Sequence, residues 1–303
     1  MPAADCRFSL MRLSPLFVLV TSLACGQASR PISGPEVKIY KTVGIVKLTA
    51  HLFRPAGSNP GGRRPAIVLF HGGGWVSGAP DWVYDAAKRY ASNGAVAVAA
   101  EYRLSDQKTI TPLDAMADAR DIVRWMRRNA ADMGIDPSRI AAYGVSAGGQ
   151  LVASLATFDD HAGNQPSPVP NAMVLISPAV LLGQDGWFQK LLRGLASGSD
   201  VSPDEHIEKV LPPTAIFIGA ADTLTPVAGV RRYCDRIKEY GGQCELHVYD
   251  GVGHLFTRKL DNQEDDFDPD PKVALDARIR GDQFLAKRGF LDVESASPEP
   301  PRK

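Results

Sequence analysis

The sequence predicts one domain of the α/β class, in which helices cover both faces of a mostly parallel central sheet with an antiparallel N-terminal edge. Three observations predict this fold. Short apolar runs recur without the polar alternation of half-exposed strands, so each is expected to be buried on both faces. Longer helical patterns separate these runs, which is typical of a sheet covered by helices. The length of 303 residues, with no internal repeat or linker, suits one large domain.

The strands are expected in a simple order along the chain. Two strand-like runs between residues 37 and 53, broken at Gly44, are expected to form the antiparallel edge. Turn residues fill positions 55–62 before the first strongly apolar run. The runs expected to form the parallel part of the sheet are residues 66–70, 95–100, 140–143, 172–176, 214–218 and 245–249.

The clearest helix is expected over residues 112–131. Thr111 supplies an N-cap, Pro112 a first-turn proline and Asp114 a capping-box acid. Apolar residues recur at helical spacing along this segment and predict one buried stripe. Further helices are expected over residues 150–158 and 273–287.

The N-terminal residues predict export. Arg7 and Arg12 precede an apolar run over residues 13–24, which small residues follow. This pattern predicts a secretory signal over residues 1–28, with Met11 as an alternative start, and hence a periplasmic or secreted protein. The run is shorter than the about 20 residues that span a bilayer, so no transmembrane anchor is expected. A buried N-terminal helix is the alternative, and the small residues that follow the apolar run disfavour it.

Three cysteines bear on localisation and stability. Cys25 follows Ser-Leu-Ala, which resembles a lipoprotein cleavage box with a displaced leucine, so a lipid anchor is an alternative to release. Cys234 lies late in an expected helix and Cys244 opens the next strand, at similar distances from the turn between them. An oxidising compartment therefore allows a disulfide, and two reduced, buried thiols are the alternative.

The folded domain is expected over residues 29–290, followed by a disordered tail over residues 291–303 that is rich in Ser and Pro. Lys and Arg total 34, and Asp and Glu also total 34. The chain therefore has no net positive charge that would attract nucleic acid or an anionic membrane. A neutral or locally polar small molecule is the expected partner. The oligomeric state has no signal in the sequence.

A glycine-rich motif surrounds the candidate nucleophile. Residues 144–149 read Gly-Val-Ser-Ala-Gly-Gly, directly after an expected strand and before an expected helix. Glycines two residues before and after Ser146 let strand and helix pass without collision, and the turn exposes the hydroxyl at a helix N-terminus. Negative charge that develops there is favoured by the helix dipole. This pattern alone is weak, because glycine is common enough for chance matches.

A second glycine-rich segment, residues 71–75 (His-Gly-Gly-Gly-Trp), follows an earlier strand. Such a turn can point bare amide N–H groups at one oxygen, where a tetrahedral intermediate carries its charge. We assign the amides of Gly73, Gly74 and Ala147 as an oxyanion hole. A glycine-rich turn with no catalytic role is the alternative.

A nucleophile of this kind needs a carboxylate and then a histidine, each just after a later strand. Asp222 follows the run at 214–218, and His254 follows the run at 245–249. A neutral imidazole can take the serine proton only if a carboxylate holds its tautomer. We therefore assign Ser146, His254 and Asp222 as a catalytic triad, with Asp250 as the rival acid.

Together these motifs, HGGGW, GVSAGG, GAADTLTP and GVGH, resemble those of bacterial carboxylesterases of the acetyl esterase/lipase type, related to the hormone-sensitive-lipase branch of the α/β-hydrolases. The resemblance covers residues 48–285 and implies the α/β-hydrolase fold. The chain departs at Val145 and Glu101, where that branch often has aspartate, and at Leu255, where it often has glycine. None of these changes removes a catalytic group. The branch's large N-terminal cap is expected to be absent.

Several other residues carry weaker signals. Trp75, Trp187 and Phe188 are candidates for a substrate pocket, with plain packing as the alternative. Arg103 and Asp118 are expected to pair as structural residues. The histidines outside the triad lack metal-ligand spacing, and the acidic segment 261–271 lacks the glycine of a calcium loop, so no metal or cofactor is expected.

The predicted activity is hydrolysis of short-chain or aryl-acyl esters, such as acetyl or feruloyl groups on carbohydrate, through an acyl-enzyme on Ser146. A non-catalytic binding protein on the same fold and an exported serine peptidase are the alternatives. Fold and triad do not determine the shape of the pocket, so the acyl and alcohol groups stay open.

Overall fold

The computed structural model describes residues 34–106, 108–158, 163–265 and 267–292. The predicted signal over residues 1–28, Cys25 and most of the predicted tail lie outside the described residues. The structure contains one eight-stranded sheet in the order β1-β2-β4-β3-β5-β6-β7-β8. The strands are β1 (Glu36–Val43), β2 (Val46–Phe53), β3 (Arg64–Phe70), β4 (Val96–Ala100), β5 (Ile135–Val145), β6 (Ala172–Ile176), β7 (Thr214–Gly219) and β8 (Cys244–Tyr249).

The sheet is parallel except at its N-terminal edge. β2 pairs antiparallel with both β1 and β4, whereas every pair from β4 to β8 along the sheet is parallel. The expected edge and the expected parallel strands are therefore confirmed. The parallel strands all end at one side of the sheet, where ligands bind in open α/β folds.

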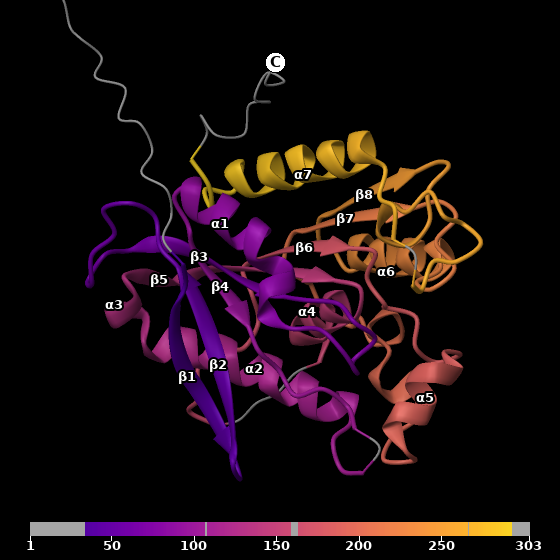
Figure 1. Cartoon of the computed structure of the whole chain (residues 1–303), viewed down its shortest axis with the longest axis horizontal. Helices are drawn as coiled ribbons and strands as arrows, with labels where there is room; N and C mark the ends of the chain where they lie inside the picture. The colour runs from indigo at the N-terminus through magenta and orange to yellow at the C-terminus, as the bar shows by residue number, and fades with distance from the viewer. Residues whose placement is uncertain (1–33, 107, 159–162, 266, 293–303) are drawn as a thin grey trace, which may run out of the picture. The chain divides into compact units, whose positions relative to one another are not determined.

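Helices cover both faces of the sheet (Figure 1). α1 (Tyr84–Ser92) and α7 (Pro271–Ala286) pack on one face. α2 (Pro112–Arg128), α4 (Ala147–Thr157) and α6 (Val227–Glu239) pack on the other. The short α3 (Ala130–Met133) follows α2, and α5 (Gly186–Leu192) lies between β6 and β7. No helix in the described part of the chain is long and apolar enough to cross a membrane.

Side-chain alternation along the central strands explains why both faces are apolar. In β3, Ala66, Val68 and Phe70 belong to the core under α2, α4 and α6, and Ile67 and Leu69 belong to the core under α1 and α7. All five are fully buried. Successive side chains of a strand point to opposite faces, so a strand covered on both sides must be apolar throughout.

The helix expected over residues 112–131 is present, but it ends at Arg128. Its N-terminus has the predicted capping box, in which Thr111 and Asp114 satisfy each other's main-chain N–H groups. Asn129 leaves the helical conformation and separates α2 from α3, which ends at Gly134 in a left-handed conformation (φ 66°). The expected single helix is therefore corrected to two.

Two further features differ from expectation. The insertion between β6 and β7 forms the two-turn helix α5, which the sequence did not predict. The folded domain also extends past residue 290. Leu291 is buried, and the main-chain N–H of Asp292 donates to the carbonyl of Asn93. The expected end of the domain at residue 290 is therefore corrected to residue 292.

Cys234 and Cys244 form a disulfide with a Cα–Cα distance of 5.5 Å. Cys234 lies in α6 and Cys244 opens β8, as the sequence analysis expected. The bond closes the tight connection through Gly241 and ties the last helix before β8 to the edge of the sheet.

Candidate active site

Ser146 lies in the sharp turn between β5 and α4, and its backbone is strained. Its φ is 52° and its ψ is −117°, a conformation that side-chain-bearing residues rarely adopt. The flanking glycines are required by close backbone contacts. A Cβ atom on Gly144 would lie 2.3 Å from the carbonyl oxygen of Gly148, and one on Gly148 would lie 2.3 Å from that of Phe70. The strand and helix therefore pass each other only because both positions are glycine.

The loop after β3 lies directly against this turn. A Cβ atom on Gly72 would be 3.2 Å from the Cβ of Ser146. The next two glycines have left-handed φ angles, 110° for Gly73 and 58° for Gly74. The carbonyl of Gly73 turns away and accepts hydrogen bonds from the N–H groups of residues 76 and 77. The loop thus folds back beside the serine with its carbonyls engaged elsewhere.

Three main-chain N–H groups remain free beside Ser146. No acceptor among the described residues takes a hydrogen bond from the amides of Gly73, Gly74 or Ala147. The amide of Ala147 is also the first of helix α4, where N–H groups have no partner within the helix. These are the donors that the sequence analysis assigned to an oxyanion hole.

The imidazole of His254 connects the serine to a carboxylate. Ser146 Oγ lies 3.0 Å from His254 Nε2, and His254 Nδ1 lies 2.9 Å from Asp222 Oδ2. A carboxylate accepts, so Nδ1 carries the proton and Nε2 is left to accept from the serine hydroxyl. The structure therefore brings together the three residues predicted as a triad. Asp250, the rival acid, is exposed at the end of β8 and has no hydrogen bond to His254.

Hydrogen bonds from its own loop hold the Asp222 carboxylate. Oδ1 accepts from the N–H groups of Leu224 and Thr225 at 3.0 and 2.8 Å. Oδ2 accepts from the Thr225 hydroxyl at 2.8 Å in addition to His254. The side chain is buried, so these donors replace water around the negative charge. The carboxylate is thereby oriented toward the imidazole.

Gln263 joins the loops that carry the acid and the histidine. Its Oε1 accepts from the N–H groups of His254 at 2.8 Å and Thr223 at 3.2 Å. Its Nε2 donates to the carbonyl oxygens of Ala221 at 2.9 Å and Leu260 at 3.3 Å. The side chain is 4% exposed, so all its hydrogen bonds come from the protein. Sequence reasoning missed this residue, because nothing local distinguishes it from the acidic residues around it.

The backbone after the histidine is strained as well. In the short helix η4 (His254–Phe256), Leu255 has φ 52° and Phe256 has φ 65°. The N–H of Leu255 donates to the hydroxyl of Ser177, which is itself buried and has φ 43°. Leu255 occupies the position where the resembling family often has glycine, and its left-handed φ explains why glycine suits that position.

His71 supports the oxyanion loop. Its ring stacks on Tyr102 with centroids 4.3 Å apart, and its Nδ1 donates to the carbonyl of Gly72 at 2.7 Å. The Tyr102 hydroxyl donates to the carbonyl of His71 at 2.9 Å. Burial lowers the pKa of His71, which favours the neutral ring. The first residue of the HGGGW motif is thus a structural one.

The three aromatic residues predicted as pocket lining differ in what they do. Trp75 and Phe188 pack edge to face with centroids 4.7 Å apart, and both are buried, at 3% and 0% exposure. Trp187 is 51% exposed, and its indole N–H donates to the carbonyl of Gly74 at 3.3 Å. Trp75 and Phe188 belong to a small core cluster with Ala147, the residue after the nucleophile, and their role in a substrate pocket stays a prediction. Trp187 is the one of the three whose side chain is exposed to solvent.

The remaining candidates behave as structural residues. Arg103 pairs with Asp118, as expected, through Nε at 2.8 Å, and with Asp114 at 2.7 Å. Buried Gln150, which the sequence analysis did not single out, accepts from the Trp75 indole N–H at 3.0 Å. Within the described ranges, no group of three His, Cys, Asp or Glu side chains is placed to hold a metal ion.

This arrangement can support nucleophilic acyl transfer. The hydroxyl of Ser146 can pass its proton to His254 as it attacks a carbonyl carbon, while Asp222 stabilises the imidazolium that forms. The free amides beside the serine can take the oxyanion of the tetrahedral intermediate.

Comparison with known proteins agrees with the fold. Residues 67–258 match a family described as having the alpha/beta hydrolase fold. The chain is 38% identical over 104 residues to the carboxylesterase NlhH of Mycobacterium tuberculosis, which covers 34% of this chain and 32% of that protein. It is 37% identical over 90 residues to an arylesterase of Saccharolobus solfataricus, 29% of this chain and 28% of that protein. The matched segments thus span about a third of these relatives.

Solved structures resemble the chain over a longer range. Esterase 2 of Thermogutta terrifontis in its apo form is 35% identical, with a TM-score of 0.76, and covers 88% of this chain and 98% of that one. The same esterase is known phosphorylated by paraoxon, at 34% identity and a TM-score of 0.75 over 86% and 96% of the two chains. It is also known with butyrate bound, at 34% identity and a TM-score of 0.76, and this match covers 86% of this chain and 96% of that one.

Proposed function

The chain belongs to the α/β-hydrolase fold family, and from this premise we propose that it is a serine carboxylesterase acting through an acyl-enzyme on Ser146. The observation that carries the proposal is the hydrogen-bonded chain from Ser146 Oγ through His254 to Asp222, at 3.0 and 2.9 Å. The esterases that the chain resembles support the same reaction.

In the proposed mechanism, Ser146 Oγ attacks the ester carbonyl carbon as His254 Nε2 takes its proton. The tetrahedral oxyanion is held by the amides of Gly73, Gly74 and Ala147, each worth about 3–4 kcal/mol in the transition state. His254 then gives its proton to the departing alcohol. Water then attacks the acyl carbon as the same imidazole takes its proton. The bond to Ser146 Oγ breaks, the imidazole returns the proton to Oγ, and the carboxylic acid leaves.

We expect small acyl groups, because aromatic side chains pack against the turn that carries the serine. Trp75 and Phe188 fill the volume next to Ala147, and the exposed Trp187 borders the oxyanion loop. The butyrate in the Thermogutta esterase supports a short acyl chain. Acetyl esters of a sugar or small alcohol are therefore the first proposed substrates, and aryl-acyl esters are the bulkier alternative.

The primary test replaces the nucleophile. Ser146→Ala is expected to remove hydrolysis of p-nitrophenyl acetate, whereas Ser92→Ala, an exposed serine in α1, is expected to retain it. A fluorophosphonate probe is expected to label the unaltered chain and the Ser92 variant only. Activity that survives in Ser146→Ala would overturn the assignment, and a chain that takes no label would support a non-catalytic binding protein.

Substrate choice needs a separate measurement. We expect kcat/KM to be highest for acetyl to butyryl groups in a series of p-nitrophenyl esters of increasing chain length. Acetylated xylan and methyl ferulate then test carbohydrate-linked acetyl and feruloyl groups. A maximum at long acyl chains would contradict the proposed substrate class.

We also propose that the protein is exported. The basic and apolar residues of segment 1–28 and the disulfide between Cys234 and Cys244 support export, since disulfides persist in oxidising compartments. Cell fractionation combined with mass spectrometry of the mature N-terminus tests this. Export predicts a periplasmic or secreted protein that begins near residue 29, and a lipid-modified Cys25 would replace release with an anchor.

A further inference from the structure

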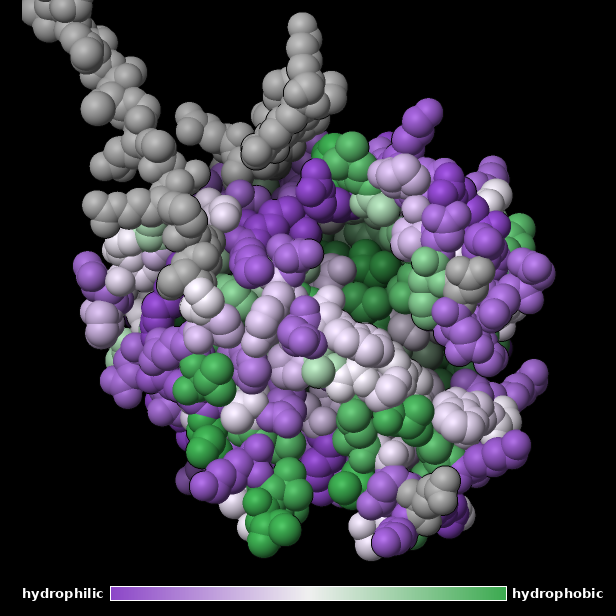
Figure 2. All heavy atoms as spheres, viewed as in Figure 1, coloured by the Kyte–Doolittle hydropathy of each residue, from purple (hydrophilic) through white to green (hydrophobic). Residues whose placement is uncertain are grey.

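A cavity of about 230 Å³ lies on the face of the sheet that carries α1 and α7. Figure 2 shows a hollow on this face with hydrophobic residues at its bottom. Its lining comes from α1, α7, the strands β5 and β6, and the helix η4 that follows the catalytic histidine. The triad mechanism uses none of its side chains.

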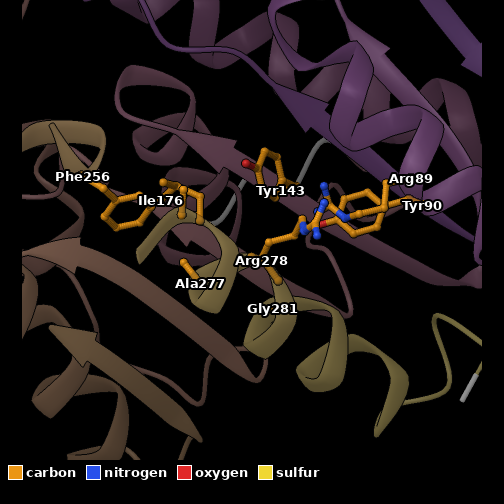
Figure 3. Close-up of a pocket in the computed structure, with 10 residues that line it drawn as sticks. Arg89, Tyr90, Tyr143, Ile176, Phe256, Ala277, Arg278 and Gly281 are labelled. Atoms are coloured by element: carbon orange, nitrogen blue, oxygen red, sulfur yellow. The ribbon is translucent and has the colours of Figure 1, made fainter. Parts of the chain in front are cut away.

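One end of the cavity is positively charged. Figure 3 shows the head groups of Arg89 and Arg278 at the same end, beside Tyr90. Arg89 is held in place, with its Nε 3.0 Å from Asp282 Oδ2 and its guanidinium 4.7 Å from the centre of the Tyr90 ring. This ion pair uses only Nε, which leaves its terminal N–H groups for other acceptors.

Arg278 adds a second positive charge with no ion pair to any described carboxylate within 4 Å. Asp282 is the carboxylate that both guanidinium groups face, so this end carries one positive charge in excess. Burial raises the pKa of Asp282, whereas Arg89 and Arg278 lower it. A ligand carboxylate would supply the missing negative charge.

The other end of the cavity is apolar. Figure 3 places Ile176 and Phe256 there, with Tyr143 between the two ends. The cavity volume of about 230 Å³ is below the roughly 300–1,000 Å³ of pockets that hold drug-sized ligands, so its ligand is smaller than those. An apolar tail of five to seven carbons or one aromatic ring fits that limit.

We propose that this cavity binds a monocarboxylate with a short apolar tail, the carboxylate on Arg89 and Arg278 and the tail toward Ile176 and Phe256. The ligand class is the same whether the acid comes from ester hydrolysis or from outside the protein. Phe256, two residues after His254 in the same short helix, contributes to the apolar end. The site itself does not depend on the proposed hydrolysis.

The test measures hexanoate binding to the full chain by calorimetry, with 1-hexanol and acetate as probes that lack the charge and the tail. Hexanoate is expected to bind and both controls to bind much more weakly. Arg278→Gln is expected to weaken hexanoate binding roughly tenfold or more, as loss of a charge-assisted hydrogen bond does. Arg280→Gln, on the same helix but paired with Asp276 at 2.6 Å, is the matched control and is expected to bind normally.

A second variant fills the cavity without disturbing the fold. A Cβ atom on Gly281 meets only ordinary contacts at 3.6 Å, with Phe217 and Val174, and the residue lies inside α7, where a larger side chain favours the helix. Gly281→Leu is therefore expected to fold with an equal or higher melting temperature and to lose hexanoate binding. Unchanged binding in Arg278→Gln or in Gly281→Leu would overturn the proposal.

Blocking the catalytic serine separates this cavity from the active site. A chain whose Ser146 carries a paraoxon adduct, verified by mass, is expected to bind hexanoate as the free chain does. Loss of binding in the adduct would place the acid at the triad and overturn the proposal. Failure to form the adduct would count against the proposed hydrolysis alone, because the Arg278 and Gly281 variants still decide the cavity.

Discussion

The side-chain oxygen of Gln263 accepts a hydrogen bond from the main-chain N–H of His254 at 2.8 Å. The same side chain donates to the carbonyl of Ala221, one residue before the catalytic acid. One buried amide thus fixes the spacing of two loops that belong to different strands. Gly253 leaves room for it, since a Cβ atom there would lie 2.5 Å from the Gln263 amide.

Gln263→Ala is expected to lower kcat about 10- to 100-fold with little change in KM, because displacement of His254 by a fraction of an ångström disturbs the transition state. Steady-state kinetics with p-nitrophenyl acetate provides the measurement. The neighbouring Asn262→Ala is the control, since Asn262 is exposed and contacts only its own loop. A rise in KM at unchanged kcat would show that Gln263 acts on substrate binding instead.

Replacement of the catalytic acid Asp222 is expected to lower kcat more than replacement of Gln263. Asp222→Asn can keep its acceptor for the N–H groups of Leu224 and Thr225, but it then presents an NH₂ group to His254 Nδ1. The imidazole must then carry its proton on Nε2, where it cannot accept from Ser146. We expect kcat to fall by about 10⁴-fold, with the melting temperature little changed. A drop of tenfold or less would mean that another group orients the histidine.

A substitution at Trp187 tests whether the hydrogen bond from α5 to the oxyanion loop contributes to catalysis. Trp187→Phe keeps an aromatic ring but removes the N–H that donates to the carbonyl of Gly74 at 3.3 Å. A neutral hydrogen bond of about 0.5–1.5 kcal/mol corresponds to a loss of roughly 2- to 10-fold in kcat. Equal kcat in variant and parent would mean that the hydrogen bond from Trp187 does not contribute to catalysis.

The predictable parts of the fold are those in which local sequence reflects burial. The apolar runs at β3, β4, β6 and β7 are confirmed, because a strand covered on both faces has no polar positions. β8, at the edge of the sheet, is only partly buried and includes Glu245 and His247. The capping box of α2 is equally local. Helix α5 was missed, since its seven residues are too few to show an apolar period, and its stability comes from packing Phe188 against Trp75.

The candidate site divides in the same way. Ser146, Asp222 and His254 were predictable because each follows a strand in a set order, and the parallel sheet brings the strand ends together. Gln263 was not, because its contacts join residues about ten and forty positions away. The burial of Trp75 and Phe188 was not predictable either, since an aromatic residue near a site can pack or line a pocket equally well.

The disulfide is expected to contribute to stability through the unfolded state. Cys234 and Cys244 are ten residues apart, and closing so short a loop is worth about 2–3 kcal/mol in the chain-entropy description. The double variant Cys234→Ala, Cys244→Ala should lose that amount in the free energy of unfolding, measured with urea. Reducing agent should destabilise the parent chain to a similar extent and leave the variant unaffected. Equal stability with and without reductant would mean that the bond contributes nothing.

Stability is expected to fall as the pH is lowered from 8 to 5, because buried and half-buried histidines resist protonation. Burial lowers the pKa of His71 and also that of His247, which stacks on Phe217 with centroids 4.9 Å apart. The unfolded chain, whose histidines have pKa values near 6.5, therefore takes up protons before the folded chain does. Below that pH the unfolded state binds more protons, so the free energy of unfolding rises with pH in this window. Urea unfolding at several pH values should show this slope, and His247→Gln should reduce it because glutamine does not titrate. A slope that is absent, or unchanged in the variant, would mean that His247 is as accessible to protons in the folded chain as in the unfolded one.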